Sequence, residues 1–278
     1  MLLTREEMSF DWKGAKLRAV EDKDALAFAF SQFLYGEVTG IQCGHWLYVA
    51  PDLDAAAFFA RQAQEELGHV RMFRQCFELL GAAPRKAHPI IRFLSTGMMP
   101  DDFADHVAIE MALGEGLVLM IFYALIDTVD HPGIRRILES AAPQEERHVE
   151  FGERRTMDAL KADPSLKSRL LGQSLVSLEA IRRLAGFLET RFGRDHDVFK
   201  RLPEFLAATI RAAEVRLTRM GLLDVPLAEL GALRKYALIA RALASGALAA
   251  VTPKRSPKLL TDTYLTDPAL TAKVDALS

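Results

Sequence analysis

A short pattern, Glu-x-x-His, occurs twice in this chain and limits how it can fold more than any other feature. The two copies are Glu66 with His69 and Glu145 with His148. On an α-helix, residues three apart lie on one face about a turn from each other, so this spacing lets a carboxylate and an imidazole bind one metal ion or a bridged pair. A single copy has little specificity, because 7 histidines among 278 residues produce it by chance. Two copies on different predicted helices favour a shared metal site.

Each copy follows an isolated carboxylate on the preceding predicted helix, Glu37 in the first half and Glu115 in the second. The carboxylate precedes the motif glutamate by 29 residues in the first half and by 30 in the second. In an antiparallel helical pair, residues equally far from the turn lie at the same height, since each helix rises about 1.5 Å per residue. The midpoints fall at the predicted turns, between Pro51 and Asp52 and at Asp130. Each isolated carboxylate is therefore predicted to be level with its motif.

Glu110 competes with Glu115 for the ligand position on the third helix. Five residues of α-helix displace it by about 7.5 Å along the axis, and its midpoint with Glu145 falls inside a predicted helix rather than in a turn. Glu115 is therefore the preferred ligand, and Glu110 is expected beside the site. The flanking Gly114 and Gly116 would leave room for a metal ion and a substrate.

The predicted fold is all-α, because helix formers dominate and β-branched residues form no alternating run. The predicted helices cover residues 22–48, 53–80, 101–130 and 133–162, followed by 165–192, 199–220 and 227–250. The first four carry the proposed ligands and form a four-helix core over residues 1–163. The last three are amphipathic and form a C-terminal helical extension over residues 164–278, which must bury its apolar faces on the same core.

Composition excludes several function classes. With 35 Lys and Arg against 37 Asp and Glu, the chain has a formal net charge of -2, which argues against a nucleic-acid partner. The most apolar uninterrupted stretch, Gly116–Ile126, is much shorter than the roughly 20 residues of a membrane span. The start lacks the basic and apolar regions of a secretory signal, and the two cysteines, Cys43 and Cys76, need not pair. A cytoplasmic protein is expected.

The motifs resemble those of the ferritin-like di-iron and di-manganese carboxylate superfamily, in which two helices each give one carboxylate and two others each give Glu-x-x-His. The resemblance covers residues 21–162 and fills every ligand place. It implies two Fe ions, or one Fe and one Mn, bridged by the motif glutamates, with one histidine on each ion. Carboxylates and imidazoles form a hard site suited to these metals. The implied metal ligands and catalytic residues are Glu37, Glu66, His69, Glu115, Glu145 and His148.

Within that superfamily, several classes fit poorly. The ribonucleotide reductase radical subunit usually has a tyrosine four positions after the first ligand histidine, where this chain has Phe73. Rubrerythrins usually carry a Cys-x-x-Cys module, and ferritins lack the second Glu-x-x-His. The motif Glu145-x-x-His148-x-x-x-Gly152 most resembles the aldehyde-deformylating oxygenases, with phenylacetyl-CoA epoxidase and tRNA-modifying hydroxylase relatives less close. Pro143 departs from a regular helix and is expected to kink or restart the fourth helix.

The resemblance implies a non-haem di-iron oxygenase or oxidase, for example a monooxygenase. It would use O₂ to oxidise a small apolar organic substrate, with electrons from a donor protein such as a ferredoxin or a reductase. Apolar residues near the ligands are expected to line a dry pocket: Phe30, Phe33, Phe73, Met111, Val118 and Phe122. A ferritin-like metal-binding or storage protein and a non-catalytic subunit of a di-iron oxygenase are the alternatives, and a homodimer is left open.

Other residues near the motifs have structural interpretations. Gly36, Gly40 and Gly44 repeat every four residues beside Glu37, which fits a substrate tunnel and close helix packing equally well. The carboxylates of Glu65, Glu146 and Glu150 are expected at the surface. The other histidines lack a carboxylate at ligand spacing and are expected to be structural or solvated: His45, His88, His106, His131 and His196.

Overall fold

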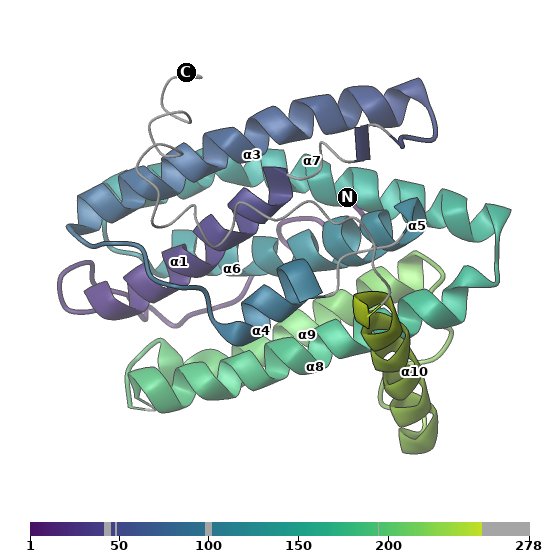
Figure 1. The fold of residues 1–278 in the computed structure, drawn as a ribbon. Helices are drawn as coiled ribbons and strands as arrows, with labels where there is room; N and C mark the ends of the chain where they lie inside the picture. The colour runs from purple at the N-terminus through teal and green to yellow at the C-terminus, as the bar shows by residue number, and fades with distance from the viewer. Residues whose placement is uncertain (42–45, 48, 98–101, 194, 252–278) are drawn as a thin grey trace. The chain divides into compact units, whose positions relative to one another are not determined.

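The computed structural model describes residues 1–41, 46, 47, 49–97, 102–193 and 195–251, and these residues are helical apart from their connections (Figure 1). The β pairing in this part of the chain is an isolated bridge between Leu17 and Val129. The predicted all-α fold is confirmed. The chain divides into two compact units. Of the described residues, the α1–α3 unit contains those of Leu17–Gly97 and Val129–Ala141, and the α6–α9 unit contains Met1–Lys16 and those within 102–128 and 142–251.

Two helices that contact each other, α1 (Lys23–Gly40) and α3 (Leu53–Leu80), form the framework of the α1–α3 unit (Figure 1). The Asp52 side chain caps α3 by accepting a hydrogen bond of 2.8 Å from the backbone N–H of Ala55. Gly81 ends α3 in the left-handed conformation with a φ of 57°. The sequence predicts both ends of this helix correctly, because cap residues act locally. The predicted first helix is longer than α1, and part of it lies outside the described residues.

After α3 the chain forms the short helices α4 (Pro89–Arg92) and η2 (Phe93–Gly97), the latter a π-helix. The ring of His88 begins α4 by accepting a hydrogen bond from the backbone N–H of Ile90 at 3.2 Å. His88 therefore has a structural role, as the sequence predicted.

The predicted third helix is one continuous helical segment of three parts: α5 (Phe103–Asp105), η3 (His106–Glu115) and α6 (Gly116–Thr128). Asp102 caps its start by accepting from a backbone N–H at 2.9 Å. The predicted extent is nearly right, but the helix type is wrong, because η3 is a π-helix. In a π-helix the backbone hydrogen bonds join residues five apart, which places them on the same face. The apolar pattern alone carries no signal for this change of period.

The segment Phe103–Thr128 is, among the described residues, the one helix long and apolar enough to cross a membrane. In the structure, 72% of its most apolar window is buried inside the protein. Burial of this kind is typical of the central helix of a globular core rather than of a lipid-exposed span.

The fourth predicted helix, α7 (Pro132–Ala162), runs without interruption through Pro143. The expected restart at this proline is therefore wrong: proline removes one backbone donor, and the rest of a long helix tolerates that loss. The ring of His131 accepts hydrogen bonds from two backbone N–H groups of the first turn, at 3.2 and 3.3 Å. Pro132 at the first helical position needs no such partner. The turn predicted before this helix is confirmed.

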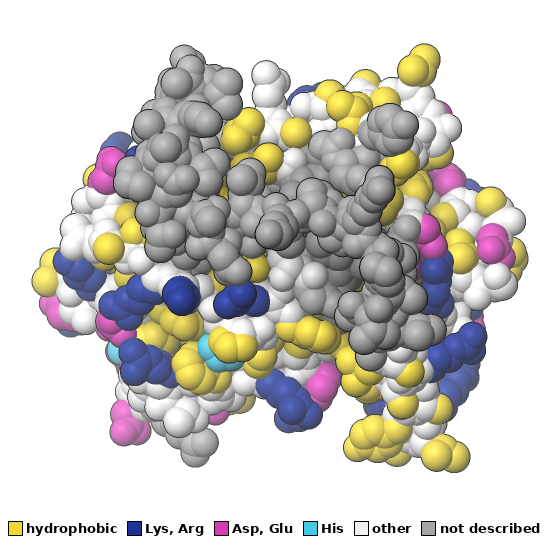
Figure 2. All heavy atoms as spheres, viewed as in Figure 1, with side chains coloured by type: hydrophobic (Ala, Val, Ile, Leu, Met, Phe, Trp, Pro, Cys, Tyr) yellow, Lys and Arg dark blue, Asp and Glu magenta, His cyan; other side chains and the backbone are white. Residues whose placement is uncertain are grey.

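The three C-terminal helices lie where the sequence predicts them: α8 (Leu166–Phe192), α9 (Leu202–Arg219) and α10 (Ala232–Val251). Within the α6–α9 unit, apolar side chains of η3 and α6 form one core cluster with those of α8 and α9. The helix α10 packs on α8, and its other side carries hydrophobic side chains at the surface (Figure 2). The domain limits at residues 163 and 164 stay a prediction.

A buried ion pair joins helices within the α6–α9 unit. The Arg216 guanidinium of α9 donates to the Glu153 carboxylate of α7 at 2.7 Å, and each residue is 1% exposed. The second oxygen of Glu153 accepts from the backbone N–H of Leu2 at 2.6 Å. A Cβ atom at Gly116 would overlap the Arg216 guanidinium. The expectation that Gly116 leaves room for a metal ion is therefore wrong, because Arg216 fills that space.

We expect Arg216→Met to lower the free energy of unfolding by about 3–5 kcal/mol, because it leaves the Glu153 carboxylate buried without its cation. Urea denaturation followed by circular dichroism measures the change. The double variant Arg216→Met/Glu153→Leu removes both charges and should lose less stability than the single variant. A loss below about 1 kcal/mol in the single variant would contradict a buried pair.

Candidate metal centre

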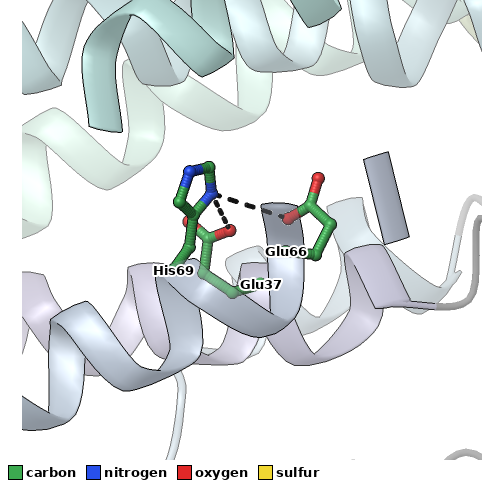
Figure 3. A group of neighbouring side chains, drawn as sticks. All are labelled: Glu37, Glu66 and His69. Carbon is green, nitrogen blue, oxygen red and sulfur yellow. Dashed lines mark hydrogen bonds and ion pairs between the residues drawn. The ribbon is translucent and has the colours of Figure 1, made fainter. Parts of the chain in front are cut away.

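Two neighbouring helices place three candidate ligands together in the α1–α3 unit. Glu37 lies on α1, and Glu66 and His69 lie on α3 (Figure 3). The Nδ1 atom of His69 is 3.1 Å from Glu37 Oε2 and 3.9 Å from Glu66 Oε2. The three side chains each offer a ligand atom within 4.8 Å of the others. Their exposed fractions are 6%, 4% and 0%, respectively. We call this group the first triad.

The distances within the first triad fit a single hard metal ion. Metal–ligand bonds of about 2.0–2.2 Å place neighbouring ligand atoms about 3 Å apart at right angles and about 4 Å apart at wide angles. The two distances from His69 Nδ1, 3.1 and 3.9 Å, lie in this range. Two buried carboxylates this close repel each other unless a proton or a cation lies between them. A bound cation would remove that repulsion.

The α6–α9 unit contains a second group with the same composition. Glu115 is the last residue of η3, and Glu145 and His148 lie on α7. The Nδ1 atom of His148 is 3.7 Å from Glu115 Oε2 and 3.6 Å from Glu145 Oε2. His148 is fully buried and Glu145 is 3% exposed, whereas the Glu115 side chain is 21% exposed. We call this group the second triad.

The sequence repeat is therefore also a repeat of geometry. In each triad one helix contributes a single glutamate and another contributes Glu-x-x-His, and the histidine presents Nδ1 to both carboxylates. The structure brings together the predicted ligands within each unit. That all six serve one metal pair stays a prediction. Either triad has the oxygen and nitrogen donors that Fe and Mn accept.

A glycine on α1 makes room for a ligand of the first triad. A Cβ atom at Gly40 would lie 2.8 Å from Glu66 Oε2, whereas a Cβ at Gly36 would meet nothing within 4 Å. At Gly40, therefore, the carboxylate of Glu66 fills the space that the missing side chain leaves. The third glycine of this series, Gly44, lies outside the described residues.

Another glycine brings α7 close to the π-helix η3. A Cβ atom at Gly152 would lie 2.6 Å from both the Ala112 backbone N and Met111 Cβ, so only glycine fits this contact. Gly152 follows His148 by about one turn of α7. The close approach of the two backbones therefore helps to set the distance between His148 and Glu115. This explains the glycine of the Glu-x-x-His-x-x-x-Gly motif in physical terms.

The π-helix changes the relation between Glu110 and Glu115. The displacement of about 7.5 Å assumed an α-helix, whereas in the π-helix η3 Glu110 and Glu115 lie on about the same face, roughly one turn apart along the axis. Glu110 Oε2 lies 2.6 Å from His106 Nδ1, so the expectation that His106 has no carboxylate partner is wrong. Glu115 is still the better candidate ligand, because its carboxylate is close to His148.

A tyrosine and a glutamate that adjoins the second triad in sequence form a hydrogen bond that the sequence did not predict. The hydroxyl of Tyr123 on α6 donates to Glu146 Oε1 at 2.7 Å. Burial, together with this hydrogen bond to a carboxylate, raises the pKa of Tyr123 well above its usual range. Glu146, which was expected at the surface, is half-buried and accepts this hydrogen bond. It directly follows the candidate ligand Glu145, and sequence spacing carries no signal for its pairing with Tyr123.

The buried cysteine and the phenylalanines of the α1–α3 unit fit a site that binds metal through oxygen and nitrogen atoms. Burial raises the pKa of the Cys76 thiol to about 12, so it stays protonated at neutral pH and is a poor metal ligand. Cys43 and His45 lie outside the described residues. The rings of Phe33 and Phe73 stack with centroids 5.3 Å apart, and Phe30 packs beside Phe73 at 6.0 Å. These rings form apolar core in the α1–α3 unit, and the predicted substrate pocket stays a prediction.

No protein-family model matches the chain, and no curated protein matches its sequence. The assignment of the two triads therefore depends on the residues themselves and on their geometry.

We expect Gly40→Ala to weaken metal binding at the first triad by about tenfold, because the added methyl group displaces the Glu66 carboxylate. Competition with a chelator of known affinity measures the change. Gly36→Ala, on the same helix with open space around its Cβ, is the matched control and should leave the affinity unchanged. Equal affinities for the two variants would contradict the role given to Gly40.

For the second triad, we expect Gly152→Ala to lower the free energy of unfolding by about 1–3 kcal/mol, because a methyl group cannot fit against η3. Gly186→Ala on α8 is the control. Its Cβ would meet nothing within 4 Å, so the change should be neutral or stabilising by up to about 1 kcal/mol. Denaturant unfolding of the metal-free proteins separates the two. A stabilising Gly152→Ala would show that α7 and η3 are not in contact there.

Proposed function

We propose that this protein is a ferritin-like, non-haem di-iron oxidoreductase that uses O₂ to oxidise a small apolar organic substrate. The observation that carries the proposal is the presence of two buried Glu/Glu/His triads with the same order of ligands along the chain. Within each triad, the histidine Nδ1 lies 3.1 to 3.9 Å from two carboxylate oxygens. A triad of this kind is suited to one hard ion, and two triads are suited to two.

The sequence repeat supports the union of the two triads in one dinuclear centre. In ferritin-like carboxylate proteins one glutamate from each of two helices and a Glu-x-x-His motif from each of two others hold the metal pair. Here Glu37 and Glu115 would be the single glutamates, and Glu66 with His69 and Glu145 with His148 would be the motifs. The bound pair, Fe/Fe or Mn/Fe, would supply the redox chemistry that activates O₂. An electron donor protein, such as a ferredoxin or a reductase of a reducing cytoplasm, completes the proposal.

The chain's own residues would control access and orientation. Burial of the histidines and of three glutamates keeps bulk water away from the donor atoms, which strengthens every charge interaction there. The Glu115 side chain is 21% exposed, so it is the ligand that an incoming molecule can reach most easily. The Phe30, Phe33 and Phe73 rings near the first triad favour an apolar substrate over a charged one.

Metal analysis of freshly purified protein is the first test. We expect two Fe, or one Fe and one Mn, per chain, because the donor set exceeds what one hard ion needs. Glu115→Ala should abolish dinuclear loading, whereas Glu110→Ala, whose carboxylate pairs with His106, should leave it largely intact. A single zinc per chain in the unaltered protein, or equal metal loss in both variants, would contradict the proposal.

The reaction with O₂ separates an oxygenase from a storage protein. In single-turnover mixing of the reduced iron form with O₂, an absorbance transient that decays faster with an apolar substrate would support oxygenation. Slow oxidation to a mineral would support metal storage instead. A fully loaded protein that does not react with O₂ would support a non-catalytic subunit.

A further inference from the structure

The helix α10 carries an apolar face that the protein leaves in water. Leu233 is 85% exposed, Tyr236 is 72% exposed and Leu243 is 45% exposed. The alanines between them, Ala237 and Ala240, are exposed as well. At about 100° per residue these positions fall within one third of the helix circumference. They form a continuous strip, which we call the α10 outer face, and its hydrophobic side chains are visible at the lower right of Figure 2.

The opposite side of α10 is already occupied. Leu238 and Ile239 pack against the core cluster of the α6–α9 unit. A Cβ atom at Gly172 of α8 would lie 2.8 Å from the carbonyl oxygen of Leu238, so the two helices are in close contact. A helix is expected to bury one apolar stripe. The outer face is a second apolar stripe on α10, so we expect another apolar environment to cover it.

Charge on and after α10 has a single sign. Between Leu230 and Thr261 the sequence contains six basic residues and no acidic residue. Three of the six are on α10 and three follow it: Arg234, Lys235, Arg241, Lys254, Arg255 and Lys258. Arg234 and Arg241 are exposed and lie seven positions apart, so both flank the same edge of the outer face. Arg234 and Arg241 therefore border the apolar strip, in a chain whose formal net charge is -2.

We propose that the α10 outer face docks on a phospholipid surface that contains anionic headgroups. An interfacial helix of this kind buries leucine and an aromatic residue at the level of the acyl chains, while arginines at its edge bind lipid phosphates. Tyr236 suits the interface, because its ring is apolar and its hydroxyl is polar. The helix would lie along the surface, held by α8 on its other side.

The same observations disfavour other occupants. A symmetric contact with a second copy through this face would bring the arginine edges of two α10 helices together, and α10 has no acidic residue to compensate them. A nucleic acid would engage the arginines but would leave the apolar centre of the strip in water. The docking needs no metal, so it is independent of the proposed activity. It would place the protein where apolar substrates accumulate.

Vesicle flotation of the full-length protein tests the docking. We expect binding to vesicles of phosphatidylcholine with about 30% phosphatidylglycerol, and little binding to phosphatidylcholine alone. Raising the salt from about 0.1 M to about 1 M should weaken binding by about tenfold, because the screening length falls from about 10 Å to about 3 Å. A protein that does not float with the anionic vesicles would overturn the proposal.

Variants show whether α10 is the part that binds. Leu233→Glu/Tyr236→Glu should lower vesicle binding by at least about tenfold, and Arg234→Ala/Arg241→Ala should remove the preference for anionic lipid. Leu53→Glu, at another leucine that is 86% exposed, is the matched control and should bind as the unaltered protein does. Circular dichroism checks that each variant is folded, and Tyr236→Ala provides a milder change. Equal binding by all variants would overturn the assignment to α10. Light scattering that detects a dimer of the unaltered protein and a monomer of Tyr236→Glu would also overturn it.

Discussion

Burial of carboxylates next to one another is the constraint on which the rest of this structure depends. Glu37 and Glu66 are each less than a tenth exposed and both face one nitrogen of His69. Such groups repel in a low-dielectric interior, and only a proton or a cation relieves the repulsion. The same arrangement recurs around His148. A chain that keeps two such groups in its helices accepts a large electrostatic cost in the metal-free state, which metal binding would offset.

The local irregularities of the helices lie beside the buried carboxylates. Gly40 removes a side chain where the Glu66 carboxylate lies, and Gly152 lets α7 approach the backbone of η3. The π-helix η3 ends at Glu115. Each feature is unfavourable for a helix taken alone, since glycine costs about 1 kcal/mol relative to alanine and π-helices are rare. All three occur beside candidate ligands, where backbone and side-chain positions matter most.

A second buried charge arrangement joins α9, α7 and the N-terminal segment. Arg216 and Glu153 are each 1% exposed and pair at 2.7 Å, and Glu153 also holds the N-terminal segment through Leu2. Glu153 lies on α7 beyond His148, so this pair stabilises the helix that carries two of the three residues of the second triad. The guanidinium needs the space beside Gly116, the residue after Glu115. The positions of α6, α7 and α9 therefore depend on one another.

The sequence alone determined the all-α fold, the ends of α3 and the membership of each triad. Helix caps such as Asp52 and Gly81 act within a few residues, and ligands at i and i+3 share a face of any α-helix. Only the tertiary structure decided the π-helical form of η3, the His106–Glu110 and Tyr123–Glu146 contacts, and the use of the space beside Gly116 by Arg216. These features depend on which backbones approach one another. Contacts between residues far apart in the chain determine these features, so the spacing of residues in the sequence does not predict them.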